Sequence, residues 1–427
     1  MKGTPLAEQM RIVLAGDRNS GKSSLMNNIF GREISIVAER PGTTTDPVTK
    51  SFELGALGAV AFSDTAGLDD DECGIGELRR RRTEEVLQEG HVLLFVTPGD
   101  RPLSASEKAL LEKARVRDRP LVVVYTFADR PPDLSKADAL RGMPSVAVDN
   151  LSGSGVNDLR KLLLSVAEEI EPEISPVEGL VHEGDLVLLV TPIDLAAPRG
   201  RLILPQVETI RDLLDRDCGA LVVKERELFS FYRALSVRPK VVICDSQVFS
   251  KVAADIPEDQ PLTSFSILFG RKKGDLVTYI RGLRALTDVP PGARILVLES
   301  CSHHRQADDI GTVKIPRLFK QLVRMDAEFS FARDLPPEEE LGKYFMVITC
   351  AGCMATRLKI VHRLNVLRRL GVHAINYGLF LAWANGLLPR ALEPFPYEHS
   401  VFLEPAEDFR PCPGKRNGIQ SVLADGA

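Results

Sequence analysis

Two cysteines separated by two residues, Cys350 and Cys353, follow an apolar run in the segment "VITCAGCMATR" (347–357). Such a pair can form a redox disulfide, bind a metal, or simply pack as two small apolar side chains. The chain has seven cysteines spread over 427 residues, an odd number that does not fit the disulfide framework of a secreted protein. We therefore expect a cytoplasmic protein, in which a close pair of thiols favours metal or redox chemistry.

A third thiol follows a second apolar run. Cys301 comes directly after "ILVLES" (295–300), with His303 and His304 beside it. Ligands of parallel sheets bind at the carboxyl ends of the strands, so neighbouring parallel strands here would bring three thiols and a histidine to one edge. Three thiolates and an imidazole suit tetrahedral zinc, and thiolate-rich sites equally suit an iron–sulfur cluster. Spacing alone leaves both open.

The segment "GDRNSGKSS" (16–24) matches the phosphate-binding pattern G-x-x-x-x-G-K-S/T between an apolar run and a helical pattern. In such a loop, backbone amides face the phosphates, the lysine contacts the β- and γ-phosphates, and the hydroxyl residue binds Mg²⁺. This predicts that Lys22 contacts phosphate and that Ser23 binds the metal. The other nucleotide contacts expected from this loop come from Gly16, Asn19, Ser20, Gly21 and Ser24.

Two further segments complete the pattern of a switch GTPase. "SDTAGL" (63–68) ends an apolar run, so Asp64 is expected to reach the Mg²⁺ through water and Gly67 to turn an amide toward the γ-phosphate. Upstream, "RPGTTTDP" (40–47) offers hydroxyls for the metal, of which we choose Thr44. The residues expected to act in hydrolysis are Lys22, Asp64 and Gly67.

The elements that must position these residues indicate an α/β protein with three domains. Apolar runs alternate with helical patterns over 1–170, which predicts a P-loop GTPase domain with a mostly parallel sheet. A Pro-containing linker leads to a small αβ region at 178–262, whose size suggests dimerisation with a second copy. Its helical stretch is expected to place Val207, Ile210, Leu213 and Leu214 on one face. A Rossmann-like parallel-sheet region follows at 264–410, and a polar tail at 411–427.

The composition argues against two classes of partner. Hydrophobic residues make up 44% of the chain and charged residues 26%, with a formal net charge of −5. No excess of Lys and Arg is present to displace counterions from nucleic acid. No apolar stretch reaches the roughly 18 residues of a spanning helix. We therefore expect neither a nucleic-acid nor a membrane partner.

The P-loop and the DTAG segment resemble the TrmE–Era group of GTPases. Asn19 stands where potassium-activated members of that group have an asparagine that coordinates the ion, so the resemblance implies K⁺-stimulated GTP hydrolysis. Guanine is normally read there by N-K-x-D, but this chain has "TFAD" (126–129), in which only Asp129 is retained. A bidentate contact to a base is worth about 1–3 kcal/mol. We expect weaker nucleotide binding and a smaller preference for GTP over ATP.

The order C-x-H, nearly fifty residues, then C-x-x-C behind a P-loop resembles the HydF family of [FeFe]-hydrogenase maturation GTPases. Matching stretches include "DTAGLDDDECGIGELR", "LTSFSILFGRKKGDL" and "CSHHRQADDIGTVKIPR". The resemblance implies a [4Fe-4S] cluster held by Cys301, Cys350 and Cys353 in a homodimer. It also implies a diiron subcluster precursor as cargo, received from radical-SAM maturases and delivered to the [FeFe]-hydrogenase apo-enzyme.

The fourth position of this cluster stays open. The family often has a histidine directly before C-x-x-C, where this chain has Thr349, which is not an iron ligand. His303, His304, another residue, water or the cargo can take the position, and His303 is our candidate. Two other functions remain: an Era-like ribosome- or tRNA-associated GTPase with a zinc-bearing accessory domain, and a redox protein that uses Cys350 and Cys353.

Overall fold

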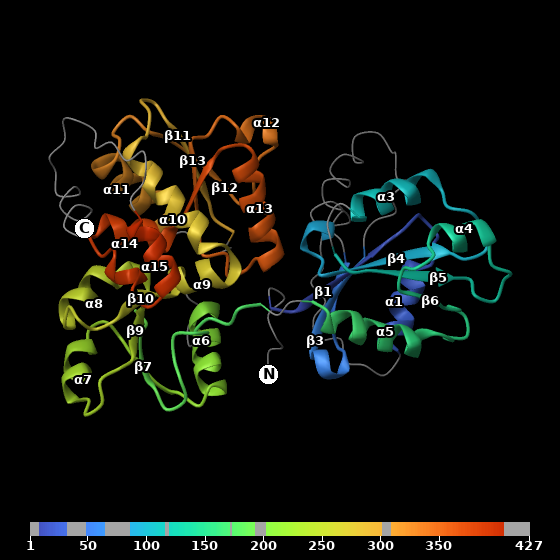
Figure 1. The fold of residues 1–427 in the computed structure, drawn as a ribbon, viewed down its shortest axis with the longest axis horizontal. Helices are drawn as coiled ribbons and strands as arrows, with labels where there is room; N and C mark the ends of the chain where they lie inside the picture. Colours follow the sequence, from blue (N-terminus) through green and yellow to red (C-terminus); the bar gives the residue numbers. More distant parts are fainter. Residues whose placement is uncertain are drawn as a thin grey trace. The chain divides into compact units, whose positions relative to one another are not determined.

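The chain divides into two units, Met1–Pro172 and Glu173–Ala427, and each is described by itself (Figure 1). A computed structural model describes residues 8–31, 48–64, 86–115, 119–170, 173–192, 202–300 and 309–404. Five residues singled out above lie outside these ranges: Thr44, Gly67, Cys301, His303 and His304.

The first unit is built on one sheet. Its strands are β1 (Met10–Ala15), β2 (Val48–Glu53), β3 (Ala59–Asp64), β4 (Val92–Pro98), β5 (Leu121–Thr126) and β6 (Ser145–Ala147). Its helices are α1 (Lys22–Phe30), α3 (Ala105–Arg115), α4 (Leu134–Ala139) and α5 (Val156–Glu168), with a 3-10 turn at Gly55–Leu57. The described strands lie in the order β2-β3-β1-β4-β5-β6, and only β2 runs antiparallel to its neighbour. The mostly parallel sheet predicted from the alternating runs is confirmed.

Helices cover both faces of this sheet, which explains why its strands are apolar throughout. Alternate residues of a strand point to opposite faces. Ile12 and Leu14 of β1 accordingly lie in one buried cluster with residues of α1 and α5, and Val13 lies in another with residues of α3. Figure 1 shows α1 and α5 on one side of the sheet and α3 on the other.

The second unit contains two sheets, each of four parallel strands in the described part of the chain. The order is β10-β9-β7-β8 in one and β12-β11-β13-β14 in the other. The strands are β7 (Leu186–Val190), β8 (Gly219–Val223), β9 (Val241–Cys244), β10 (Leu262–Ser264), β11 (Arg294–Leu298), β12 (Glu328–Ala332), β13 (Met346–Thr349) and β14 (His373–Asn376). A single buried cluster contains residues of both sheets, among them Leu189 of β7 and Ile348 of β13.

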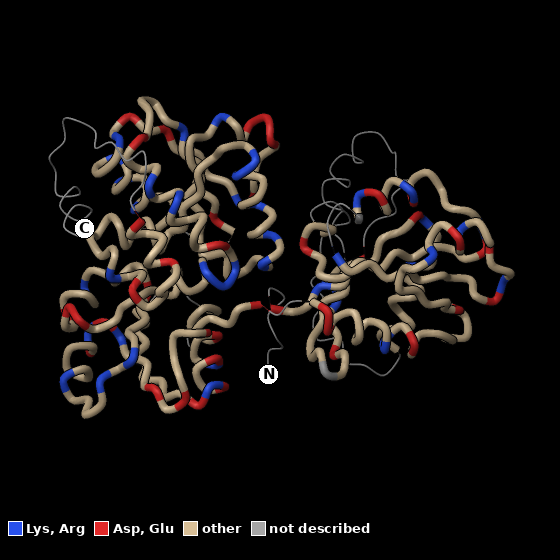
Figure 2. The backbone as a smooth tube through the Cα atoms, in the orientation of Figure 1, with Lys and Arg blue, Asp and Glu red and all other residues tan. Residues whose placement is uncertain are grey.

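The helices of this unit are α6 (Leu204–Asp215), α7 (Leu228–Ala234), α8 (Phe249–Asp255), α9 (Phe265–Lys273), α10 (Leu276–Arg284), α11 (Ile315–Leu322), α12 (Glu338–Leu341), α13 (Arg357–Arg369), α14 (Tyr377–Ala384) and α15 (Pro396–Leu403). Short 3-10 turns lie at Ser246–Val248, Ala285–Thr287 and Arg390–Leu392, and a π-helical turn at Ile310–Lys314 precedes α11. None of the helices described here is both long and apolar enough to cross a membrane. Figure 2 shows basic and acidic residues interspersed along both units.

The four apolar residues expected on one face of α6 differ in burial. Leu213 is fully buried and Ile210 packs against the core, but Val207 and Leu214 are 47% and 56% exposed. The buried stripe instead includes Thr209, whose hydroxyl donates to the carbonyl of Pro205 at 2.7 Å. That bond satisfies the hydroxyl within the helix, so Thr209 can occupy a buried position although it is polar. Val207 and Leu214 lie on the exposed side of the helix.

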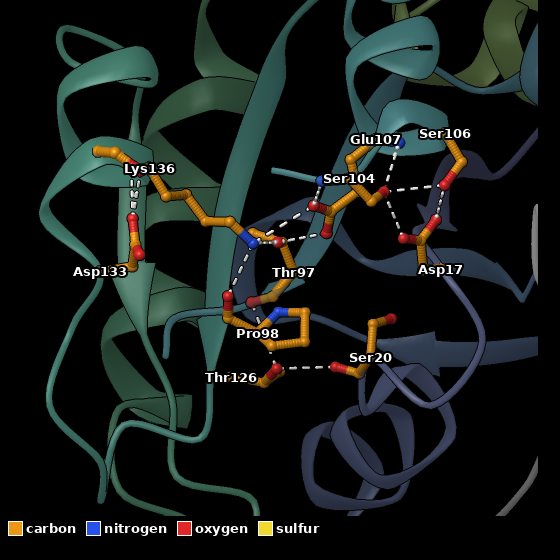
Figure 3. Close-up of polar contacts among 11 residues, drawn as sticks. Asp17, Ser20, Thr97, Pro98, Ser104, Ser106, Glu107, Thr126, Asp133 and Lys136 are labelled. Atoms are coloured by element: carbon orange, nitrogen blue, oxygen red, sulfur yellow. Dashed lines mark hydrogen bonds and ion pairs between the residues drawn. The ribbon is translucent and has the colours of Figure 1, made fainter. Parts of the chain in front are cut away.

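A buried ion pair joins α4, α3 and the end of β4 in the first unit (Figure 3). The ammonium of Lys136 lies 3.3 Å from Glu107 Oε2 and donates to the carbonyl of Pro98 at 2.9 Å. Both charged side chains are almost completely buried. Burial lowers the pKa of Lys136, and the charge of Glu107 opposes that shift. The pair fixes the end of β4, next to the nucleotide site.

Replacing Lys136 by Met leaves Glu107 as an uncompensated buried charge, so we expect the first unit to lose about 3–5 kcal/mol of local stability. Hydrogen exchange of peptides from β4 and α3, followed by mass spectrometry, will then accelerate by about two to four powers of ten. The double variant Lys136→Met/Glu107→Leu will recover most of the protection. The control Lys161→Met removes an exposed ion pair to Asp158 and should change little. Unchanged exchange in Lys136→Met would contradict a structural role for the pair.

Candidate functional site

The phosphate-binding loop lies between β1 and α1. Gly21 lies directly before α1 as its N-cap, with φ 92°, and a Cβ there would lie 2.7 Å from Asn150 Nδ2, so only glycine fits. The ammonium of Lys22 donates to the carbonyls of Gly16 and Asp17 at 2.9 and 2.7 Å. Ser20 is buried, whereas Asn19, in the left-handed region with φ 60°, is exposed together with Ser23 and Ser24. The loop thus holds its lysine folded over its own backbone.

A metal site for Mg²⁺ is outlined by Ser23 and Asp64. Parallel pairing of β1 with β3 sets Leu14 opposite Asp64, which brings the end of β3 to the start of α1. The hydroxyl of Ser23 donates to Asp64 Oδ2 at 3.1 Å. Asp64 Oδ1 is buried without a hydrogen-bond partner among the described residues. Mg²⁺ prefers such oxygen donors, so these residues fit the ion.

Burial also raises the pKa of Asp64, while the charge of Lys22 and the hydrogen bond from Ser23 act in the opposite direction. Ionisation of this carboxylate is therefore energetically unfavourable when no cation is bound. A bound divalent ion would relieve that cost, since an opposite charge favours the ionised form.

The strand end that normally reads guanine is used differently here (Figure 3). Thr126 is fully buried, and its hydroxyl donates to the carbonyl of Ser20 at 2.7 Å. It therefore ties β5 to the phosphate-binding loop and does not face a base. The next residue, Phe127, carries the guanidinium of Arg130 over its ring at 4.6 Å. Asp129 is exposed, as a base-reading carboxylate must be before nucleotide binds.

Asn150 makes a second tie to the same loop. Its Nδ2 donates to the carbonyl of Gly21 at 3.2 Å, and Asn28 Nδ2 donates to the backbone carbonyl of Asn150 at 2.9 Å. The carboxylate of Asp149 accepts the amides of Leu151 and Ser152, which fixes the turn that follows. Asn150 therefore holds the phosphate-binding loop, and Asp149 orders the turn beside it.

Asp17 is a positioning residue that the sequence did not single out. Its carboxylate accepts hydrogen bonds from the hydroxyls of Ser104 and Ser106 at 2.6 and 2.7 Å (Figure 3). Ser104 and Glu107 also exchange hydrogen bonds at the start of α3, each side chain accepting from the other residue's amide at 3.0 Å. The pattern S-x-x-E in "SASE" is the sequence signal of this capping box.

The cysteine pair lies at the carboxyl end of β13. β11 and β13 are parallel neighbours, with Leu298 opposite Thr349, so the predicted pairing of these strands is confirmed. The amide of Ser300, two residues beyond β11, donates to Cys350 Sγ at 3.4 Å. Cys350 and Cys353 are both buried, 9% and 8% exposed. The residue directly before Cys301 therefore touches Cys350, and Cys301 itself lies outside the described residues.

The turn between the two cysteines needs glycine. Gly352 has φ 68°, and a Cβ there would come 2.8 Å from Ile360 Cδ1 on α13. Thr349 is buried, and its hydroxyl donates to the carbonyl of Cys350 at 3.2 Å. Within the described ranges no group of three or more His, Cys, Asp and Glu side chains forms a metal site. Two buried thiols beside a backbone amide donor fit a thiolate-ligated centre, zinc or iron–sulfur.

Comparison with known proteins now adds to this geometry. Residues 177–274 match the family model described as the Hydrogen maturase F dimerization domain, and residues 277–394 match the Hydrogen maturase F tetramerization domain. The chain belongs to the hydrogen maturase F family. Residues 11–127 match the model described as 50S ribosome-binding GTPase, so the first unit is a P-loop GTPase domain.

Among curated proteins, the tRNA modification GTPase MnmE of Syntrophobacter fumaroxidans is 38% identical over 162 residues, 37% of this chain and 34% of that protein. MnmE of Geobacter metallireducens is 31% identical over 160 residues, 38% of this chain and 34% of that protein. The chain thus spans about a third of the length of these relatives.

Solved structures also match. The G domain of the T. maritima FeoB iron transporter is 20% identical, with a TM-score of 0.30 over 38% of this chain and 99% of that one. An Era variant of Aquifex aeolicus bound to GDP and AlF4⁻ is 16% identical, with a TM-score of 0.32 over 53% of this chain and 98% of that one.

We expect Asp64→Asn to slow GTP hydrolysis about 10–100-fold, the usual effect of losing a residue that acts on a metal through water. The same variant should melt at a higher temperature without Mg²⁺. The raised pKa of Asp64 means that the folded protein disfavours the ionised carboxylate, so removing the charge stabilises it at neutral pH. Phosphate-release kinetics and calorimetric melting measure the two effects. Asp158→Asn, at an exposed position, is the control. A lower melting temperature in Asp64→Asn would contradict this electrostatic account.

The segment 126–129, which retains only Asp129 of the guanine motif, predicts that the protein discriminates weakly between GTP and ATP. Isothermal titration calorimetry should show ATP binding within about 1–3 kcal/mol of GTP, because Asp129 is the one retained residue of the guanine motif. Asp129→Ala should remove the remaining preference, and Asp133→Ala, which changes only the cap of α4, should not. Sub-micromolar GTP binding with no binding of ATP by the wild type would show that another group reads the base.

Proposed function

We propose that this chain is a GTP-hydrolysing scaffold and carrier for the diiron subcluster of the [FeFe]-hydrogenase active site. In this proposal Cys301, Cys350 and Cys353 hold a [4Fe-4S] cluster, and His303 is a candidate for its fourth, exchangeable position. The cargo comes from radical-SAM maturases and passes to the [FeFe]-hydrogenase apo-enzyme. The single observation that carries the proposal is the contact of Ser300 with Cys350 Sγ, because it brings the chain adjoining Cys301 to the cysteine pair.

A cluster bound here would supply an iron site at which the cargo is held and released. The chain's own residues prepare that place. Burial of Cys350 and Cys353 keeps bulk water from the thiols, and the turn at Gly352 between them packs closely against Ile360 of α13. The Ser300 amide offers a hydrogen bond to sulfur, which stabilises a thiolate. An open fourth position suits a carrier, because the cargo must both bind and leave.

In the GTPase unit, Lys22 and Ser23 bind the phosphates and Mg²⁺, and Asp64 orients the metal through water. Thr44 and Gly67 are the proposed switch residues, and Asn19 the proposed ligand of a stimulating K⁺ ion. As in other switches, the γ-phosphate would order these loops and hydrolysis would release them. We propose that this change governs the exchange of partners.

Self-association is proposed on the face formed by α6 and β8. Among the described strands β8 lies at the edge of its sheet, with Val222 40% exposed. Val207 and Leu214 of α6 are exposed as well, which is unusual for large apolar side chains on one helix. An unpaired strand edge beside apolar side chains is suited to pairing with a second copy. The match to a dimerization domain over 177–274 supports this location.

Single replacement of Cys301, Cys350 or Cys353 by Ala is expected to abolish retention of iron and sulfide after anaerobic reconstitution, because each removes one of three thiolate ligands. GTP hydrolysis should persist in all three variants, since the P-loop lies in the other unit. Cys218→Ala, which alters a buried cysteine directly before β8, serves as the matched control.

Iron and sulfide analysis with EPR of the reduced protein provides the measurement. Retention of a cluster by Cys301→Ala would contradict the proposal that residues adjoining β11 and β13 form one site. Stoichiometric zinc without sulfide would favour an Era-like GTPase with a zinc-bearing accessory domain.

A further inference from the structure

A buried arginine on α13 connects the ends of two strands beside the cysteine pair. Arg363 is 5% exposed. Its Nε donates to Asp334 Oδ1 at 3.0 Å and its Nη2 to the carbonyl of Arg333 at 3.2 Å, both just beyond β12. Its Nη1 donates to the hydroxyl of Ser300 at 2.8 Å, just beyond β11. One guanidinium therefore fixes two loops that leave the same edge of the sheet.

These contacts lead directly to a cysteine sulfur. The residue held by Nη1 of Arg363 is Ser300, whose amide donates to Cys350 Sγ at 3.4 Å. Asp334, Arg363, Ser300 and Cys350 thus form a continuous series of polar contacts. Ser300 also sits immediately before Cys301 in the sequence. The arginine consequently holds the side chain of the residue whose amide faces the sulfur.

The charges along this series favour an anionic occupant. Asp334 pairs with Lys359 at 2.7 Å as well as with Arg363, so two cations face one carboxylate. Their positive charges lower the pKa of Asp334 in spite of its burial, which keeps the carboxylate ionised. Two of these three charged groups are cations and one is an anion. Thiolates gathered in a buried site carry negative charge, which a nearby buried cation stabilises.

A purely structural role for Arg363 is the alternative, because a buried guanidinium can also fasten α13 to the sheet. That role needs the bonds to Asp334 and the Arg333 carbonyl. It does not need the third bond, to the one hydroxyl whose own amide faces Cys350 Sγ. Hydrogen bonds to sulfur and nearby charge are two of the factors that set the potential of an iron–sulfur centre.

We propose that Arg363 is a positioning residue of the cysteine site, which orients the Ser300 amide toward Cys350 Sγ and raises the reduction potential of the centre bound there. This inference rests on the proposed function, since it concerns the iron–sulfur centre assigned to these cysteines.

The test compares Arg363→Gln and Ser300→Ala with the control Arg369→Gln in reconstituted full-length protein. Arg369 lies on the same helix, is mostly exposed and pairs with Glu338. An EPR-monitored redox titration should show one-electron reduction about tenfold less favourable in Arg363→Gln, which is a shift of about 59 mV to lower potential. Ser300→Ala keeps the Arg363–Asp334 pair and should shift the potential in the same direction by a smaller amount. Arg369→Gln should match the wild type.

Potentials equal to the control in Arg363→Gln and Ser300→Ala, with iron and sulfide content unchanged, would overturn the inference and leave the proposed function standing. If Arg363→Gln does not fold, Ser300→Ala decides alone, because it leaves the arginine and its carboxylate in place. A wild-type protein that takes up no iron would refute the proposed function itself, and this inference with it.

Discussion

Neighbouring parallel strands end at the same edge of a sheet, and both candidate sites depend on that constraint. In the first unit, pairing of β1 with β3 sets Leu14 opposite Asp64 and brings the carboxylate to the helix that carries Lys22 and Ser23. In the second unit, pairing of β11 with β13 sets Leu298 opposite Thr349, so Ser300 reaches Cys350. Residues about fifty positions apart in the sequence thereby become neighbours.

Each site is also supported by a buried cation that hydrogen-bonds to the loops around it. Lys136 holds Glu107 and the end of β4, and Glu107 in turn caps the helix whose Ser104 binds Asp17 of the phosphate-binding loop. Arg363 plays the corresponding part in the second unit. A buried charge is expensive unless it is fully paired, so such pairs make the geometry of a site sensitive to single substitutions.

The strands and the two motifs could be predicted from the sequence because both are local. Apolar runs of strand length preceded the P-loop, the DTAG segment and the C-x-x-C pair, and parallel pairing then implied that the cysteine loops meet. The supporting contacts could not be predicted. Arg363 and Ser300 are 63 positions apart, and Thr126 binds a carbonyl 106 positions away, so no periodicity connects them. The burial of Thr209 in α6 could not be predicted either, because it depends on the hydrogen bond that its hydroxyl makes within the helix.

The central claim is that the loops beyond β11 and β13 together form one iron–sulfur site. Iron and acid-labile sulfide, measured per chain in the anaerobically reconstituted protein, test it most directly. The account predicts about four of each, with the EPR signal of a reduced cluster. One zinc per chain, without sulfide or that signal, would contradict it.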